Sequence, residues 1–200
     1  MQIDRLEASL ESKLARHEYG MIEHSMWTEL FAQSFYAYGR ANRYEHAPDE
    51  AGRLALVQEL DRVYRWIDTE ERIKFRAVGK TGIENGIIYQ GHRLHVLALL
   101  AKYRGDPDTL RLLDTEAKKV SAVLAVSPRF TAESYPRWAW WVDNIDAYYA
   151  LHLADRINRT DDYRVLTDKW IAEIKSSLDA SGNVLAEAYG PYMAENQARS

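Results

Sequence analysis

Residues 85–92 (NGIIYQGH) contain the side chains best suited to proton transfer, in a segment that runs from a glycine-containing loop into an apolar helix. Tyr89 and His92 are three residues apart, so a helix would place them on one face. A histidine at the mouth of an apolar pocket can act as a general acid or base near neutral pH. Gly91 removes side-chain bulk beside His92, which would leave room for a ligand. The spacing is equally compatible with a capping histidine that satisfies backbone groups.

Residues 135–144 (YPRWAWWVDN) form a second candidate segment, in which aromatic side chains precede an acid and an amide at the expected start of a helix. The functional interpretation is an aromatic wall beside a carboxylate, Asp143, that orients His92 or takes a proton. Burial among aromatic rings would raise the pKa of Asp143. Asp143 could instead cap the helix by accepting from its free N–H groups. The side chains expected to bind substrate are Tyr135, Trp138, Trp140, Trp141 and Asn144.

Asp146 follows Asp143 by three residues, on the same helical face. The two carboxyls could form an acid/base pair, or Asp146 could simply face solvent. A carboxyl pair would suit a carbohydrate-active enzyme, because inverting hydrolysis uses two carboxyls about 6.5–9.5 Å apart. In that interpretation Asp143 is the first carboxyl, Glu84 is the candidate for the second, and the tryptophans stack on sugar rings.

Two patterns that could bind a metal or a nucleotide are incomplete in the sequence. His92 and His95 are three residues apart and could face the same way, but a zinc site needs a third and a fourth ligand. Residues 79–81 (GKT) would end a phosphate-loop motif only if position 74 were glycine, and it is Lys74. We therefore expect no cofactor and no metal.

Helices must position these candidate residues, and apolar side chains spaced by three and four predict helices along nearly the whole chain. Residues 48–50 (PDE), 105–108 (GDPD) and 160–162 (TDD) are typical helix-start signals. No stretch alternates as a strand would, apart from a short hairpin that could include Val184 and Leu185. The expected helices cover about residues 3–18, 22–44, 49–66, 88–103, 107–126, 141–158 and 162–178, followed by a turn at 179–183.

A helix, a short polar turn and a second helix recur three times, with a spacing of about 55 residues. Longer loops at about 67–87 and 127–140 separate these pairs. An α/α toroid places such loops at one end of its barrel, where a pocket lies. We expect one all-α domain over residues 1–200, with about seven helices arranged as the hairpins of an incomplete α/α toroid.

The composition excludes several classes of protein. The 200 residues carry 26 basic and 30 acidic side chains, and this net charge of −4 argues against a nucleic-acid binder. The lack of cysteine rules out disulfides, thiolate zinc sites and cysteine nucleophiles. The longest apolar run, Val96–Ala101, is far too short to span a membrane. Because residues 1–5 lack the apolar segment of a signal peptide, we expect a cytoplasmic protein.

In their order and spacing, these segments resemble the linalool dehydratase/isomerase family and its α/α-toroid relatives. Residues 89–92 (YQGH) and 102–106 (KYRGD) are similar to the family's Tyr-Ser-Gly-His helix and its Thr-Gly-Asp ending. Residues 135–144 are similar to its Tyr-Pro…Trp…Asp-Asn stretch, and residues 178–185 to a Leu-Asp…Gly-Leu turn. The resemblance covers about residues 65–200.

The resemblance implies cofactor-free acid/base chemistry in an apolar cavity, by which water is added to or removed from a small isoprenoid alcohol. His92 would be the histidine acid/base and Tyr89 its neighbour in the pocket. The position that carries a cysteine in family members, just before the Asp-Asn pair, is Val142 here. A complete toroid of twelve helices needs roughly 300 residues. We therefore expect either a homo-oligomer or a missing C-terminal half to cover an exposed apolar edge.

Three functions remain open at this point. The first is a lyase or isomerase acting on a small apolar alcohol, in which the catalytic residues are His92, Asp143 and Tyr89. A cation-like transition state would gain from the aromatic faces around it. The second is a carbohydrate-active enzyme on the same toroid. The third is a non-catalytic helical module or an inactive fragment, which buried, paired positions for His92 and Asp143 away from any cavity would favour.

Overall fold

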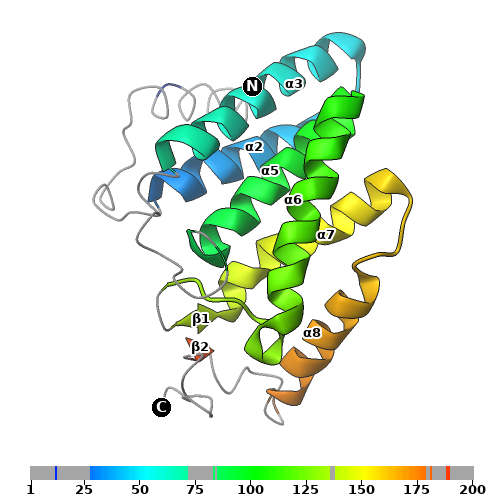
Figure 1. Ribbon diagram of the computed structural model, residues 1–200. Helices are drawn as coiled ribbons and strands as arrows, with labels where there is room; N and C mark the ends of the chain where they lie inside the picture. Colours follow the sequence, from blue (N-terminus) through cyan, green and yellow to red (C-terminus); the bar gives the residue numbers. More distant parts are fainter. Residues whose placement is uncertain are drawn as a thin grey trace.

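The computed structural model describes residues 28–71, 83, 85–135, 138–178 and 188–189, together with Ser12 and Ser181. This part of the chain is mostly helical, which confirms the predicted all-α class (Figure 1). The predicted helix at 3–18 and most of the predicted turn at 179–183 lie outside the described residues. The α-helices are α2 (Thr28–His46), α3 (Glu50–Trp66), α5 (Gly86–Arg104), α6 (Pro107–Val126), α7 (Trp141–Asn158) and α8 (Arg164–Ser176).

Short elements connect these helices. A π-helical turn, η2 (Ile67–Glu71), extends α3, and a 3-10 turn, η4 (Pro128–Phe130), follows α6. Two-residue strands β1 (Ala139–Trp140) and β2 (Ala188–Tyr189) pair antiparallel. The sequence pattern suggested a short hairpin nearby, but residues 184 and 185 themselves lie outside the described part.

Two of the three predicted helix-start signals act as local caps. At the third, residues 160–162, the N–H groups of Asp162 and Tyr163 donate to Asp155, and α8 has no side-chain cap. The Asp49 carboxylate accepts a hydrogen bond from the Gly52 backbone N–H at 2.6 Å. The Asp106 carboxylate accepts from the N–H groups of Asp108 and Thr109, ahead of a proline at the first position of α6. Such caps satisfy N–H groups that have no partner inside the helix. Helix boundaries therefore follow from residues close in sequence.

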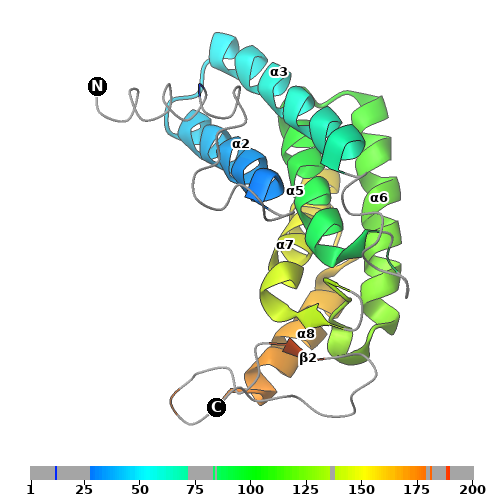
Figure 2. The same ribbon diagram turned by 90° about the vertical axis from the view of Figure 1, so that its left-hand side faces the viewer.

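The helices form three consecutive pairs, α2–α3, α5–α6 and α7–α8, with α5 in the middle of the structure. Figure 2 shows α2 and α7 on one side of α5 and α6 on the other, with α3 running above α2 and across the upper part of α5. The first helices of the three pairs run in the same direction. Phe31 contacts His92 near the start of α5 and Glu45 binds Lys102 near its end, while Gly91 lies beside Ala147 of α7.

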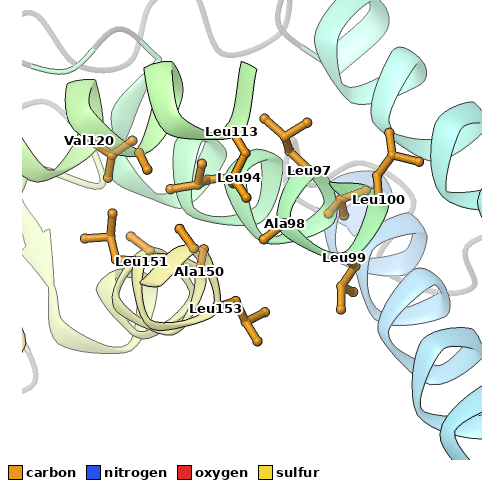
Figure 3. Packing of buried hydrophobic residues seen from close by; sticks show 14 of the residues in the cluster. Leu94, Leu97, Ala98, Leu99, Leu100, Leu113, Val120, Ala150, Leu151 and Leu153 are labelled. Carbon is orange, nitrogen blue, oxygen red and sulfur yellow. The ribbon is translucent and has the colours of Figure 1, made fainter. Parts of the chain in front are cut away.

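The main core surrounds α5. This helix is apolar on nearly all sides, and most of its side chains are buried. Leucines of α5 pack against α6 on one side and against α7 on the other (Figure 3). Small side chains on α5 and α7 let these two helices lie close. The core residues labelled in Figure 3 are Leu94, Leu97, Ala98, Leu99, Leu100, Leu113, Val120, Ala150, Leu151 and Leu153.

Gly91 is the point of closest approach between α5 and α7. A Cβ atom on Gly91 would lie 3.0 Å from the Ala147 backbone nitrogen and 3.5 Å from its Cβ. The space beside Gly91 is therefore filled by α7, and it is not left for a ligand as the sequence suggested. The missing side chain instead lets His92 and His95 of α5 approach the neighbouring residue of α7, Asp146.

Replacing Gly91 by alanine should destabilise the protein by about 1–3 kcal/mol, because the backbone of α7 must move away from the new methyl group. The matched control is Gly39→Ala in α2, where an added Cβ meets nothing within 4 Å. Gly39→Ala should raise the free energy of unfolding by up to about 1 kcal/mol, through helix propensity alone. Urea unfolding of the two variants measures both effects. Equal stabilisation by both substitutions would contradict the close helix contact.

Candidate functional site

The centre of the candidate site is the carboxylate of Asp146, which lies between two histidines of α5. Its Oδ1 is 2.9 Å from Nδ1 of His95, and its Oδ2 is 3.5 Å from Nε2 of His92. His92 is 3% exposed, whereas 22% of the Asp146 side chain reaches solvent. One carboxylate therefore faces two nearly buried imidazoles and keeps an edge at the surface.

Tyr38 of α2 completes this polar group, which we call the Asp146 cluster: Tyr38, His92, His95 and Asp146. The Tyr38 hydroxyl is 2.9 Å from Nδ1 of His92. Its ring stacks on His95, with the two ring centroids 3.8 Å apart. The cluster thus joins side chains from α2, α5 and α7, the three helices that run in parallel.

Aromatic rings surround the two histidines of the cluster. Phe31 and Phe35 of α2 present their edges to His92, at centroid distances of 5.1 and 5.7 Å. Tyr149 of α7 lies edge-on to His95 at 4.9 Å. Phe35 is 56% exposed and Tyr149 is 49% exposed, so the aromatic surround reaches the protein surface.

Burial and mutual contacts determine the charges in the cluster. Burial lowers the pKa of His92 to about 4, with the neighbouring Asp146 charge opposing and His95 adding to the shift. Burial tends to raise the pKa of Asp146, but the hydrogen bond from His95 and the nearby histidines bring it below its usual value. Burial and the Asp146 charge raise the pKa of Tyr38 well above its ordinary value. At neutral pH the cluster therefore contains an ionised Asp146, a neutral His92 and a neutral Tyr38.

The chain matches no protein-family model, and no curated protein matches it in sequence. Among the residues with described placement, no three His, Cys, Asp or Glu side chains are grouped as a metal site. Within the same residues, no helix has both the length and the apolar character needed to cross a membrane. Glu84 and the GKT sequence at residues 79–81 lie outside the described part. What the site can do must follow from the geometry of its own side chains.

Asp143 lies in the first turn of α7, one turn before Asp146. Burial raises the pKa of Asp143 to about 6; a hydrogen bond with Ser134 opposes this shift and the Asp146 charge adds to it. Burial and the charge of Asp143 also raise the pKa of Tyr135. The expected rise in the pKa of Asp143 is thus present. The carboxylate that contacts His92, however, belongs to Asp146.

Asn144 and Tyr89 bind backbone groups. The Asn144 side chain is fully buried; its Oδ1 accepts from the Ala132 N–H, and its Nδ2 donates to the carbonyls of Ala132 and Trp140. The Tyr89 hydroxyl donates to the Ile67 carbonyl at 3.0 Å. These contacts attach the loop before α7 and the turn after α3 to the helices around the site.

The tryptophans predicted to wall the pocket occupy three different environments. Trp141 is buried against Ala139 and Ile174. Trp140 lies in β1, where it pairs with Ala188. Trp138 is 39% exposed, on the same loop as Tyr135. Of the predicted aromatic wall, Tyr135 lies close enough to Asp143 to be affected by its charge, and Trp138 lies at the surface.

Sequence reasoning considered His95 only as a metal ligand and did not identify Tyr38, Phe35 or Tyr149. Phe35 and Tyr38 are three residues apart on α2, and their rings contact each other at 5.9 Å. An aromatic pair on one helical face is a weak signal, because it is also typical of an ordinary core. The link to His92 requires packing between helices about 54 residues apart in sequence.

His92 and Asp143 should make opposite contributions to stability as pH changes. The folded state lowers the pKa of His92 to about 4, so the unfolded chain binds more protons below about pH 6.5. Acid therefore lowers the free energy of unfolding by up to about 3 kcal/mol. The folded state raises the pKa of Asp143 to about 6. The contribution of Asp143 to the free energy of unfolding is therefore greatest at low pH and falls by up to about 3 kcal/mol as pH rises through about 6.

The two contributions offset each other between about pH 4 and pH 6, and single substitutions separate them. Asp143→Asn should make the protein more sensitive to acid than wild type, whereas His92→Gln should make it less sensitive. Urea unfolding of both variants across this pH range measures the difference from wild type. Parallel pH profiles for all three proteins would contradict the assigned burial of these groups.

Proposed function

We propose that this chain is a cofactor-independent acid/base catalyst of the lyase or isomerase type, acting on a small apolar alcohol. The observation that carries the proposal is the Asp146 cluster, in which one ionised carboxylate supports two imidazoles inside an aromatic surround. A carboxylate that holds a histidine is a common way to prepare an imidazole for proton transfer. A polar group of this kind between packed helices is costly unless its members satisfy each other.

The aromatic surround suits the transition state of such a reaction. Loss of a hydroxyl from an alcohol develops positive charge on carbon, and aromatic faces attract a cation. Phe35 and Tyr149 combine contact with the histidines and exposure at the surface. We propose that a small apolar substrate approaches the cluster from the surface beside these two rings.

The helix arrangement supports an incomplete α/α toroid as the scaffold. In such a barrel the first helix of each pair lines the centre, as we propose for α2, α5 and α7. Val142, Ile145 and Tyr149 are exposed along α7 and leave an apolar stripe on this helix. We propose that further helices, from a second copy or from additional chain, cover that stripe. Light scattering after size exclusion tests this, since a monomer of 23.1 kDa would exclude the second copy.

Incubation of the purified chain with small tertiary and allylic alcohols, and with the corresponding alkenes, tests the activity. Gas chromatography should show dehydrated, hydrated or isomerised product that saturates with substrate. His92→Ala should reduce the rate by at least about 100-fold while helical circular dichroism is retained. The control is His46→Ala, at the exposed end of α2, which should leave the rate unchanged. No turnover by wild type, or equal turnover by His92→Ala, would contradict the proposal.

A second candidate, a carbohydrate-active enzyme, is favoured by the different pKa shifts of Asp143 and Asp146. The pKa of Asp143 is raised to about 6, while that of Asp146 is lowered. A protonated carboxyl and an ionised one are the pair that glycoside hydrolysis requires. Release of reducing sugar from a glycoside panel, lost in Asp143→Asn, would favour this alternative over the alcohol chemistry.

A further inference from the structure

The hydrogen bonds of the Asp146 cluster determine which nitrogen of each histidine carries a proton. An ionised carboxylate can only accept hydrogen bonds, so each nitrogen that faces Asp146 must be an N–H donor. His95 therefore carries its proton on Nδ1, 2.9 Å from Oδ1 of Asp146. Nε2 of His92 lies 3.5 Å from Oδ2, a charge contact longer than a usual hydrogen bond, and an N–H on Nε2 is the arrangement that the carboxylate favours.

The second nitrogen of His92 is also occupied. If the one N–H of the neutral imidazole is on Nε2, the acceptor is Nδ1, and the Tyr38 hydroxyl lies 2.9 Å from it. The same hydroxyl also forms a hydrogen bond with Asp146. Both nitrogens of His92 are thus used by the protein. With 4% of its side chain exposed, His92 has neither a free lone pair nor access to a substrate.

The second nitrogen of His95 has a different environment. Within the described residues, Asp146 is the hydrogen-bond partner of His95, and it binds Nδ1. In the neutral imidazole, with its N–H on Nδ1, Nε2 is the nitrogen with the lone pair, and 9% of the side chain is exposed. The ring is held by Tyr38, stacked at 3.8 Å, and by Tyr149, which lies edge-on at 4.9 Å. A carboxylate on Nδ1–H fixes the tautomer and stabilises the imidazolium that forms when Nε2 takes a proton.

We propose that Nε2 of His95 is the atom that exchanges a proton with the substrate, and that His92 is a positioning residue that links Tyr38 to Asp146. This inference rests on the proposed acid/base function and assigns its reactive atom. It differs from the sequence-based expectation, in which His92 was the acid/base. His92 is instead the member of the cluster whose two ring nitrogens both face protein groups, Tyr38 and Asp146.

In the elimination direction, Nε2 of His95 accepts the proton that leaves carbon as the C=C bond forms. The C–O bond breaks and its electron pair stays on oxygen. His95 then returns the proton to that oxygen, so water leaves and the imidazole is neutral again. Hydration of the alkene uses the same steps in reverse. Asp146 keeps its negative charge throughout and neutralises the imidazolium.

Nitrogen-15 NMR of the full chain, labelled at histidine, tests the tautomers without any substrate. When both rings are neutral, His95 should show a protonated Nδ1 and an unprotonated Nε2, and His92 should show the reverse. The variants His95→Gln and His92→Gln assign the signals. A protonated Nε2 on His95 would overturn the inference whether or not the chain turns over an alcohol.

Kinetics of the same two variants test the roles. His95→Gln should lose at least about 10³-fold in kcat, because an amide cannot accept the proton. His92→Gln should lose no more than about tenfold, because its amide can donate to Asp146 and accept from Tyr38. Added imidazole should partly restore turnover to His95→Ala but not to His92→Ala. Turnover that survives His95→Gln would overturn the assignment of Nε2, while the proposed function would stand.

Discussion

Replacing Asp146 by asparagine should lower kcat/KM by about 10³- to 10⁴-fold at neutral pH, the largest effect on activity that we expect from a single substitution. The substitution preserves size and shape but removes the negative charge between the two histidines. An imidazolium on His95 would then lose its neighbouring carboxylate. The substitution therefore destabilises the state in which His95 is protonated. Because this state forms during the reaction, kcat should change more than KM.

The asparagine would also disturb the hydrogen bonds of the cluster in a predictable way. An amide offers one acceptor and two donors, while His92 and His95 both present N–H groups to this position. If the amide oxygen accepts from His95, its NH₂ group faces Nε2 of His92, which must then lose its proton to become an acceptor. His92 would move its proton to Nδ1, and the Tyr38 hydroxyl would turn from donor to acceptor.

Steady-state kinetics on the alcohol identified by the substrate panel, with nitrogen-15 NMR of His92, measure both consequences. The control is Asp114→Asn, an exposed carboxyl on α6 that pairs with Lys118. This control should leave kcat/KM and the His92 signals unchanged. Activity of Asp146→Asn within tenfold of wild type would show that the cluster does not carry the reaction.

The helices could be predicted from the sequence because their boundaries depend on nearby residues. The predicted helix at 141–158 has the bounds of α7, Trp141–Asn158, and the one at 107–126 has those of α6, Pro107–Val126. At the start of α6, Asp106 accepts from local N–H groups, and Pro107 has a fixed backbone angle that suits the first helical position in whatever fold surrounds it. The predicted helix at 22–44 lacks a comparable start signal; residues 28–46 are described as α2.

Only part of the candidate site could be predicted from local sequence patterns. His92 and Asp143 stood out because each lies in an unusual local segment, and Asp146 was noted as a neighbour of Asp143. The partnership of His92 with Asp146 depends on the crossing of α5 and α7, which no local pattern describes. Gly91 was the one sequence feature that pointed to this crossing. Its missing side chain makes room for α7, and not for a ligand.

The substrate contact predicted for Asn144 stays a prediction, and the structure shows which groups its side chain binds. Asn144 was expected to bind substrate because it follows an aromatic segment and an acid. In the structure, its side chain binds backbone groups of Ala132 and Trp140 instead. A buried amide must be hydrogen-bonded, and backbone groups of nearby loops are common partners. Residue type alone cannot distinguish these partners from a ligand.

Replacing Asn144 by alanine should reduce the free energy of unfolding by about 3–5 kcal/mol, the largest effect on stability that we expect. The substitution removes three hydrogen bonds, and it leaves the N–H and C=O of the buried Ala132 without their partner. Each unsatisfied buried group costs about 1–3 kcal/mol. Because a domain is stable by only about 5–15 kcal/mol, this loss should be evident in urea unfolding. Asn158→Ala, at the exposed end of α7, should change stability by less than about 0.5 kcal/mol.

The isosteric variant Asn144→Asp separates hydrogen bonding from size. One carboxyl oxygen can still accept from the Ala132 N–H, but the other would face the carbonyl oxygens of Ala132 and Trp140. A protonated carboxyl could donate to one of them, so the folded state should raise the pKa of the new group. Stability should therefore be highest below about pH 4 and fall as pH rises through the folded pKa.

Because Ala132 precedes Ser134 and Tyr135, loss of this anchor should also increase amide exchange in the loop beside Asp143. A variant as stable as wild type at every pH would mean that Asn144 does not hold the loop.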